Sequence, residues 1–396
     1  MIKLASAELC TACGACVYRC PQKCIKMPEN DIGVPYPVID IEACIECHTC
    51  EKSCPVLFSP QGNIPQTVYA AWSVDEEQRL TSASGGIAYE FYQYAIKHGY
   101  KCVGASLNAD FTVSLKLAEK PEELIAFKNS KYVYSEIHTL LPRISEELRH
   151  GEKILVMGLP CQIAAIKKLF PHQENLVLVE ILCHGNTPSS YLKQHIEYIE
   201  QRTGKRAAVV DFRTPSYQTY TYTFTLRDHN GEEFYAARAK DGDTYQYAYH
   251  RAVSYRESCY HCSFAKEERV GDITLADYWG LGNKTPFNHE IRNVSMVQIN
   301  SEKGSSFWDD VVSSGVVYTE ERPLEEAQEG NPRLLRTNPK SKDRIIFERE
   351  IAQNHGDFEK AIKEPIKLYL KRQNDSRLVL HFRGFIYRIK KMMCKL

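Results

Sequence analysis

Two groups of four cysteines near the N-terminus repeat one spacing that suits iron–sulfur chemistry. The first group is Cys10, Cys13, Cys16 and Cys20, and the second is Cys44, Cys47, Cys50 and Cys54. Each group reads C-x-x-C-x-x-C-x-x-x-C-P, with a proline directly after the last cysteine. Three thiolates at this spacing wrap one face of an iron–sulfur cube, and the fourth is directed to the cube of the other group. The sequence therefore predicts two 4Fe–4S clusters in this segment.

The crossing of the fourth cysteine assigns the ligands of each cluster. One cluster is predicted to take Cys10, Cys13, Cys16 and Cys54, and the other Cys44, Cys47, Cys50 and Cys20. Structural zinc usually binds two separated C-x-x-C pairs, and disulfides need an oxidising compartment, so neither suits this crowding. The segment resembles the bacterial-type dicluster ferredoxins. Cys24 is an extra thiol, and we predict that it packs as a small side chain rather than binding iron.

A second set of cysteines is predicted to meet at the edge of a sheet. Residues 153–182 read as a buried strand, an amphipathic helix and a second buried strand, so the two strands should run parallel. Cys161 and Cys183 follow these strands and therefore lie at the edge where open α/β sheets bind ligands. Cys161 also begins a helix, where a thiolate is favoured. A later C-x-x-C adds Cys259 and Cys262, and we predict that these four thiols hold a third 4Fe–4S cluster.

Zinc is the alternative at this third site, because four thiolates also satisfy its coordination. The two clusters predicted in the N-terminal segment favour an iron–sulfur cluster at this site. An electron relay needs a redox-active acceptor, and zinc has no redox chemistry. His184 and His261 adjoin these cysteines. Such histidines more often bond to nearby backbone, and both are left out of the predicted ligand set.

The turn Thr81–Gly86 is rich in small residues and leads into a helical pattern that begins at Ile87. A helix that opens in this way leaves backbone N–H groups bare, and these suit a phosphate. A plain N-cap without a ligand explains the same pattern equally well. Ser130, Lys131 and Tyr132 form a second polar turn, which by itself indicates no particular function.

Composition places the chain among ordinary globular proteins. It has 396 residues, of which 43% are apolar and 25% charged. Basic and acidic residues balance at 50 each, so nothing points to nucleic acid. Only nine residues precede Cys10, which leaves no room for a signal peptide, and no long apolar run follows. With 15 cysteines, we expect metal or redox chemistry in a reducing cytoplasm.

We predict an α+β ferredoxin-like dicluster module, then an α/β domain with a mixed, partly parallel sheet and a helical C-terminal tail. The predicted regions are 1–62, 66–150, 151–320 and 321–396, with a linker near residues 56–66. Strict alternation over Tyr217–Leu226 predicts one strand of a β-rich segment. Residues from Ile366 to Leu396 are basic and interleaved with apolar side chains. They predict either a helix that lies on an anionic membrane surface or a docked or solvated helix.

Several motifs in order resemble the beta-subunit family of coenzyme F420-reducing hydrogenase and F420-dependent dehydrogenases. They are Gly158-Leu159-Pro160-Cys161-Gln162, Cys183-His184-Gly185, the C-x-x-C at Cys259, and Asp272-Ile273-Thr274-x-x-Asp277-x-Trp279-Gly280, with Ser82-x-Ser84-Gly85-Gly86 and Ser130-Lys131-Tyr132 before them. Ala276 stands where the family usually has glycine. The resemblance implies bound FAD, and with the small-residue turn it places the flavin on Ser84, Gly85, Gly86, Ser130, Lys131 and Tyr132.

The resemblance also implies the kind of activity. We expect an oxidoreductase that passes electrons between a ferredoxin-like partner, its clusters, FAD and a reducible small molecule. That molecule is coenzyme F420 or another compound, and bacterial relatives often lie beside genes for cell-surface polysaccharide synthesis. The alternative is a non-catalytic electron-transfer subunit of a larger redox complex. No catalytic residue is predicted.

Overall fold

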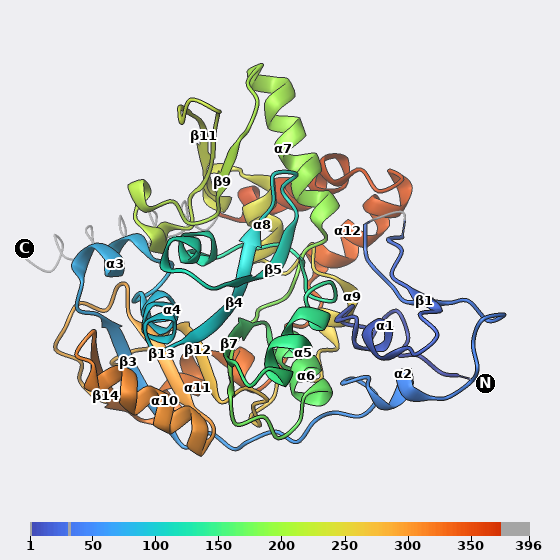
Figure 1. Cartoon of the computed structure of the whole chain (residues 1–396). Helices are drawn as coiled ribbons and strands as arrows, with labels where there is room; N and C mark the ends of the chain where they lie inside the picture. The colour runs from blue at the N-terminus through green and yellow to red at the C-terminus, as the bar shows by residue number, and fades with distance from the viewer. Residues whose placement is uncertain (1, 31–32, 374–396) are drawn as a thin grey trace, which may run out of the picture.

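The computed structural model describes residues 2–30 and 33–373. A small N-terminal module contains two short helices and one antiparallel pair of two-residue strands, and it lies against one side of a larger domain (Figure 1). Its elements are α1 (Ala15–Arg19), β1 (Ile25–Lys26), β2 (Val38–Ile39) and α2 (Thr49–Lys52). So little regular structure leaves most of the module as cysteine-bearing loops.

The larger domain is built on a nine-stranded mixed sheet in the order β14-β3-β13-β12-β8-β7-β4-β5-β6. The strands are β3 (Thr67–Ser73), β4 (Tyr100–Leu107), β5 (Val113–Ala118), β6 (Ser135–Glu136), β7 (Lys153–Gly158), β8 (Leu176–Ile181), β12 (Ile273–Asp277), β13 (Ser295–Ile299) and β14 (Val317–Arg322). Neighbours from β12 through β8 and β7 to β4 run parallel, as do β5 and β6, and the other pairs are antiparallel. The predicted mixed, partly parallel sheet is confirmed.

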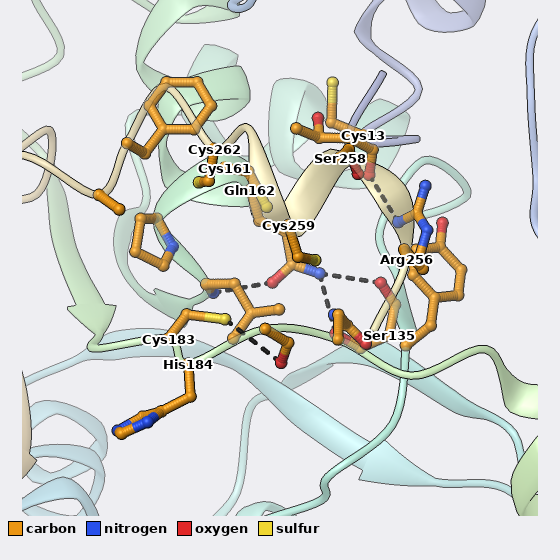
Figure 2. A pocket seen from close by; sticks show the side chains of 18 of the residues that line it. Cys13, Ser135, Cys161, Gln162, Cys183, His184, Arg256, Ser258, Cys259 and Cys262 are labelled. Atoms are coloured by element: carbon orange, nitrogen blue, oxygen red, sulfur yellow. Dashed lines mark hydrogen bonds between the residues drawn. The ribbon is translucent and has the colours of Figure 1, made fainter. Parts of the chain in front are cut away.

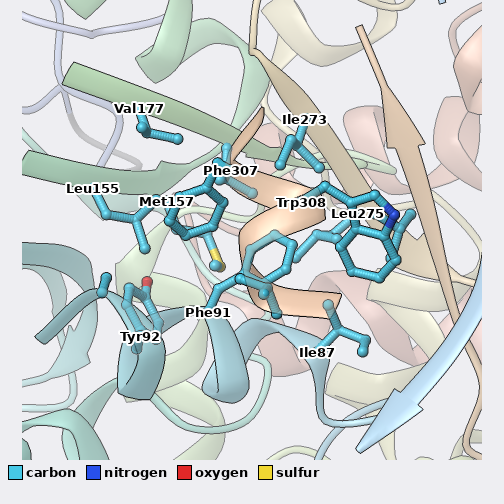
Figure 3. Close-up of a cluster of buried hydrophobic side chains, with 14 of the residues drawn as sticks. Ile87, Phe91, Tyr92, Leu155, Met157, Val177, Ile273, Leu275, Phe307 and Trp308 are labelled. Atoms are coloured by element: carbon cyan, nitrogen blue, oxygen red, sulfur yellow. The ribbon is translucent and has the colours of Figure 1, made fainter. Parts of the chain in front are cut away.

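Helices cover both faces of this sheet. Alternate residues of β7 point to opposite sides, so Leu155 and Met157 pack beneath α4 (Ile87–Lys97) and α10 (Glu302–Ser313). Phe91 and Trp308 fill the middle of that layer (Figure 3). Ile154 and Val156 face the other way, toward α5 (Leu141–Arg149) and α6 (Pro160–Leu169). Because both faces are buried, the central strands read as continuous apolar runs.

A second, helix-rich layer follows the sheet. It comprises α7 (Ser189–Thr203), the three-stranded sheet β11-β10-β9 (Glu233–Ala237, Phe224–Arg227, Val209–Asp211), α8 (Thr244–His250), α9 (Glu257–Tyr260), α12 (Lys342–Gln353) and a helix over residues 358–373, whereas α11 (Leu324–Gly330) packs against β3 of the large sheet. The helical C-terminus is therefore confirmed as far as residue 373. Most of the basic segment predicted from Ile366 to Leu396 lies outside the described residues. None of the described helices combines the length and apolar character needed to cross a bilayer.

The predicted strand over Tyr217–Leu226 is wrong in its first half. Residues 215–221 form two short 3-10 turns, and β10 begins only at Phe224. Gln218 and Tyr222 have positive φ angles of 64° and 55°, which a strand cannot accommodate. The turns wrap around Arg213, whose Nε donates to the Thr219 carbonyl at 2.8 Å.

The predicted regions 66–150 and 151–320 contribute strands to the same sheet. β3 comes from the first region and lies between β13 and β14, which come from around residues 295–322. β14 also runs across the predicted boundary at residue 320. The division into regions 66–150 and 151–320 therefore stays a prediction about the sequence. It does not describe separate layers of the structure.

Candidate functional site

The eight N-terminal cysteines surround two separate cavities. Cys10, Cys13, Cys16 and Cys54 line the one that we call the inner cysteine cavity. Cys20, Cys44, Cys47 and Cys50 line the other, the outer cysteine cavity, where Cys47 is exposed at the surface. Each cavity thus receives three cysteines from one group and one from the other, which is the grouping that the crossed-over rule predicts. That these cysteines bind iron stays a prediction.

Cys24 also lines the outer cysteine cavity. Its Sγ lies 3.4 Å from Sγ of Cys20, and its side chain is buried. We predicted a packed thiol, and the side chain is packed, yet it lies as close to the cavity as a ligand would. Cys24 is therefore a fifth thiol at a site that needs four.

The four later cysteines meet beyond the carboxyl edge of the large sheet. Cys161, Cys183, Cys259 and Cys262 line one cavity, the sheet-edge cysteine cavity, and Figure 2 shows them around a shared space. Burial raises the pKa of Cys161 well above its ordinary value, and the other three thiols add to the rise. Here burial outweighs the favourable helix N-terminus. In the described part of the chain, no three His, Cys, Asp or Glu side chains are grouped to hold a single metal ion.

Buried polar contacts hold the turns that carry Cys161 and Cys262. Gln162 receives a hydrogen bond from the Leu159 N–H at 2.8 Å and donates to the Ser135 carbonyl at 2.9 Å. On the other side, Arg269 is paired with Glu180, and its Nη1 donates to the Lys266 carbonyl at 2.9 Å. The side chains of Arg269 and Glu180 are almost fully buried, so the ion pair fixes the loop that follows Cys262 to β8.

The N-terminal module is docked against the sheet-edge cysteine cavity. Cys13 lines both this cavity and the inner one. Arg256 donates to the carbonyl oxygens of Thr11 at 3.0 Å and Cys10 at 3.3 Å, and its guanidinium lies 4.8 Å from the ring centroid of Tyr134. The Tyr134 hydroxyl in turn donates to the Ala12 carbonyl at 3.0 Å. Two of the three candidate cluster sites are therefore direct neighbours.

The two histidines beside these cysteines have different surroundings. His184 lines the sheet-edge cysteine cavity, and burial lowers its pKa, which favours a neutral ring. His261 lies within 3.3 Å of a Glu257 carboxylate oxygen and is half exposed. Neither side chain was assigned as a ligand.

A much larger cavity opens on the other side of Cys183. It has a volume of about 450 Å³ and extends from the N-terminus of α4 to the carboxyl ends of β7, β8 and β12. Leu159, Gln162, Cys183, His184 and Asn186 line both this large cavity and the sheet-edge cysteine cavity. The two cavities therefore share a wall.

Most of the residues predicted to bind flavin line the large cavity. They are Ser84, Gly86, Ser130, Lys131 and Tyr132. Gly85 instead faces the sheet, where a Cβ atom would lie 2.5 Å from the Ala71 carbonyl oxygen and 2.8 Å from the Ser295 backbone nitrogen. The sequence could not distinguish two adjacent glycines, because only the strands beside them show which one is tightly packed.

Lys131 is less available to bind a flavin than predicted. Its Nζ donates to the carbonyl oxygens of Ala126 and Lys128, both at 2.9 Å, and burial lowers its pKa to about 7. Lys128 is a second amine on the same wall, bonded to Gln78 and Thr81 at the end of α3 (Glu76–Thr81). The cavity thus has two lysines near the N-terminus of α4, and only one of them was predicted.

The far wall of the large cavity is largely aromatic, and only part of it was predicted. The ring of Tyr132 stacks on Tyr249 with centroids 4.4 Å apart, and Tyr222 lies between His250 and Trp279. Arg213 forms an ion pair at 2.8 Å with Asp277, the last residue of β12. Tyr132, Asp277 and Trp279 belong to recognised motifs, but the other side chains come from segments without any spacing signal.

Two segments of the chain match known protein families. Residues 9–57 match the 4Fe-4S dicluster domain, and residues 151–325 match the C-terminal family of the coenzyme F420 hydrogenase/dehydrogenase beta subunit. The segment that matches the beta-subunit family supplies all four cysteines of the sheet-edge cysteine cavity.

Two proteins whose names include coenzyme F420 match parts of this chain. The coenzyme F420-dependent sulfite reductase of Methanocaldococcus jannaschii is 29% identical over 178 residues, which cover 43% of this chain and 27% of that protein. The chain therefore spans only about a quarter of the length of that relative. The coenzyme F420 hydrogenase subunit beta of Methanococcus voltae is 23% identical over 274 residues, 66% of this chain and 85% of that subunit.

One solved structure is also similar. It is a xenon derivative of the F420-reducing NiFe hydrogenase complex from Methanosarcina barkeri, with a TM-score of 0.44 and 19% identity. The match covers 77% of this chain and 92% of the other.

Proposed function

We propose that the protein carries single electrons between a ferredoxin-like partner and a redox cofactor in the large cavity, through three 4Fe–4S clusters. The observation that carries this proposal is the wall shared by the sheet-edge cysteine cavity and the large cavity, in which Cys183 faces both. On the opposite side, Cys13 faces both the inner and the sheet-edge cavities. The inner and sheet-edge cysteine sites thus lead toward the large cavity, and the outer site reaches the surface at Cys47.

The residues present fit the clusters. The outer, inner and sheet-edge cysteine cavities each offer four thiols around a space, and a 4Fe–4S cluster supplies one-electron redox chemistry to such a site. We propose Cys20, Cys44, Cys47 and Cys50 as ligands of the outer cluster, Cys10, Cys13, Cys16 and Cys54 for the inner, and Cys161, Cys183, Cys259 and Cys262 for the third. The N-terminal module would accordingly be ferredoxin-like.

The large cavity fits a cofactor with a phosphate group, and we propose FAD. α4 begins at Gly86 without a side-chain cap, and Ile87 and Ala88 of its first turn line the cavity. Ser82 Oγ and Asn129 Oδ1 on the same wall are buried and have no hydrogen-bond partner among the described residues. Lys128 and Lys131 would supply positive charge, and the stacked rings of Tyr132 and Tyr249 would offer a flat apolar face.

The substrate is proposed to be a small molecule that exchanges a hydride equivalent with the bound cofactor. The names of both relatives include coenzyme F420, and we therefore propose that coenzyme or a compound of similar chemistry. No described residue bears on a role in polysaccharide synthesis, which stays a prediction from the sequence.

A non-catalytic role is the second candidate. The Methanococcus voltae relative is named as a subunit, and the present chain covers most of it. In that case the chain would deliver electrons to another protein, and flavin bound in the isolated chain would not turn over with a small molecule.

Metal and flavin analysis tests the proposal directly. After anaerobic purification we expect about twelve iron atoms, as many sulfides and one FAD per chain. About eight iron atoms with no flavin would contradict both the third cluster and the cofactor cavity. Reduction of the bound flavin by a small-molecule donor would favour the enzyme over the subunit.

Substitution of Ala88 by Asp tests the flavin site. An acidic side chain in the first turn stabilises a helix, so Ala88→Asp should leave α4 intact while it repels a phosphate. We expect most of the bound FAD to be lost and the iron content to stay unchanged. Lys342→Asp makes the same kind of change in the first turn of α12 and should have no effect on flavin. Unchanged flavin in Ala88→Asp would refute the placement.

A further inference from the structure

The three cysteine cavities differ in the charge of their walls. Among the described residues, the walls of the outer and inner cysteine cavities contain no charged side chain. The sheet-edge cysteine cavity is lined by three arginines, Arg256, Arg269 and Arg333, and by no aspartate or glutamate of the described chain. All three guanidinium groups belong to the larger domain.

Each of these arginines has an N–H group without a partner. Arg256 Nε, Arg269 Nη2 and Arg333 Nη1 are buried, and none is hydrogen-bonded within the described residues. Buried N–H groups are rarely left unsatisfied in proteins. Three of them on the wall of one cavity therefore indicate that something else accepts their hydrogen bonds.

Their positive charges are balanced to different degrees. Arg269 is paired with Glu180, so its charge is largely compensated. Within the described residues, Arg256 contacts only uncharged groups, the carbonyls of Thr11 and Cys10 and the ring of Tyr134. Arg333 has no carboxylate partner in the described part of the chain. Two uncompensated charges thus remain at this cavity.

Arg256 also links two of the cysteine cavities. Figure 2 shows its side chain hydrogen-bonded to the segment beside Cys13. Its guanidinium donates to the carbonyl oxygen of Cys10, a residue that lines the inner cysteine cavity. The inner cysteine cavity therefore lies close to this positive charge, whereas no charged side chain of the described residues lines the outer one.

We infer that Arg256, Arg269 and Arg333 set the direction of electron flow by making the sheet-edge site the easiest of the three to reduce. This inference rests on the proposed function. Each added electron makes a site more negative, and fixed positive charges and N–H donors at short range favour that state. Burial opposes reduction, but it also leaves the guanidinium charges poorly screened.

The electron balance of this inference is simple. A one-electron donor of the ferredoxin type loses one electron at the outer site, and the same electron arrives at the sheet-edge site beside the large cavity. No bond forms and no proton moves along this path. Two such transfers supply the two electrons of a hydride equivalent.

The experiment is a reductive titration of the full-length protein followed by electron paramagnetic resonance. The signal that Cys262→Ser removes identifies the sheet-edge cluster. We expect that signal to appear at the highest potential, the inner cluster next and the outer cluster last. Arg333→Gln should move only the sheet-edge signal to lower potential, Arg333→Lys should restore it, and the remote Arg227→Gln should move none.

The outcomes separate the inference from the function on which it rests. If no third cluster is present, the proposed function itself fails. If three clusters are present but the sheet-edge cluster is reduced last, only the inference is overturned. An unchanged potential in Arg333→Gln overturns it as well. Should Arg333→Gln lose its cluster, the order of reduction in the unsubstituted protein still decides.

Discussion

The N-terminal module and the edge of the large sheet assemble cysteine sites in opposite ways. In the module, the eight predicted ligands run from Cys10 to Cys54 and are carried mostly by loops. At the sheet edge, the four cysteines come from three segments, two of which follow the parallel strands β7 and β8. Local spacing therefore encodes the first kind of site, and the topology of the sheet encodes the second.

The walls follow the same division. Apolar and small side chains close around the module's cavities, because a short loop brings little else with it. The sheet-edge cavity recruits charged side chains from across the larger domain. A site assembled from distant parts can thus be tuned by residues that a compact loop site cannot reach, but it depends on the whole fold.

The largest effect is expected when one cysteine of the sheet-edge site is replaced. Cys262→Ser removes one thiol of the sheet-edge site and should cost about four of about twelve iron atoms per chain, with the N-terminal clusters intact. Electrons should then stop at the module, and the flavin should no longer be reduced through it. Iron analysis and rapid-mixing absorbance would measure both effects.

Cys102→Ser is the matched control, since Cys102 is a buried cysteine of β4 that lines none of the cysteine cavities. It should keep all its iron. Loss of all three clusters in Cys262→Ser would show that the two kinds of site are not independent.

A smaller effect is expected in the outer cysteine cavity. Because Cys24 Sγ lies 3.4 Å from Cys20 Sγ, Cys20→Ser should retain most of its iron by using the neighbouring thiol. The double variant Cys20→Ser/Cys24→Ser should lose about four iron atoms, and Cys24→Ser alone none. Resonance spectra should then lack the outer signal and keep the inner one. A single Cys20→Ser variant that loses the whole cluster would show that Cys24 does not substitute.

The smallest effect concerns stability far from the cysteines. His195 lies between Asp243, at 3.1 Å, and Glu359, at 2.7 Å. Burial lowers the pKa of His195, but the two carboxylates together raise it more, to about 9. A raised pKa stabilises the folded state below the unfolded value of about 6.5, and this gain disappears as pH rises toward 9.

Denaturant unfolding at pH 6.5 and 9.5 measures this effect. We expect a loss of up to about 3 kcal/mol at the higher pH, which His195→Gln should largely abolish. If the sheet-edge site depends on the whole fold, its iron should be released before that of the module as the protein loosens. Simultaneous release would contradict that dependence.

The sequence predicted the parts of the fold that short-range patterns determine. β7 and β8 were recognised as buried apolar runs, and the rule for parallel strands then placed Cys161 and Cys183 at one edge. The alternating Tyr217–Leu226 segment looked like a strand because its Tyr and Thr residues repeat with the right period. Its turns surround Arg213, which forms an ion pair with Asp277. No local pattern reveals such a contact between residues that are distant in sequence.

The arginines of the sheet-edge cavity show the same limit more sharply. Arg256 and Arg269 flank the C-x-x-C, which was a weak signal that they lie near its cysteines. Arg333 lies far along the chain, and a single arginine in a loop has no spacing to interpret. The cysteines could be predicted because cluster chemistry fixes their number and spacing. The charged residues around them follow no fixed number or spacing.

The position of β3 has a consequence for how the protein is made. β3 is the first strand after the N-terminal module, yet its partners β13 and β14 lie near the end of the sheet-forming sequence. At ~5–20 residues per second, a ribosome needs roughly 10–45 seconds to add the intervening chain of about 220 residues. During that time the module has all its cysteines and β3 has none of its neighbours. Iron is therefore expected to enter the nascent chain first at the module, and β3 must wait unpaired until the last strands emerge.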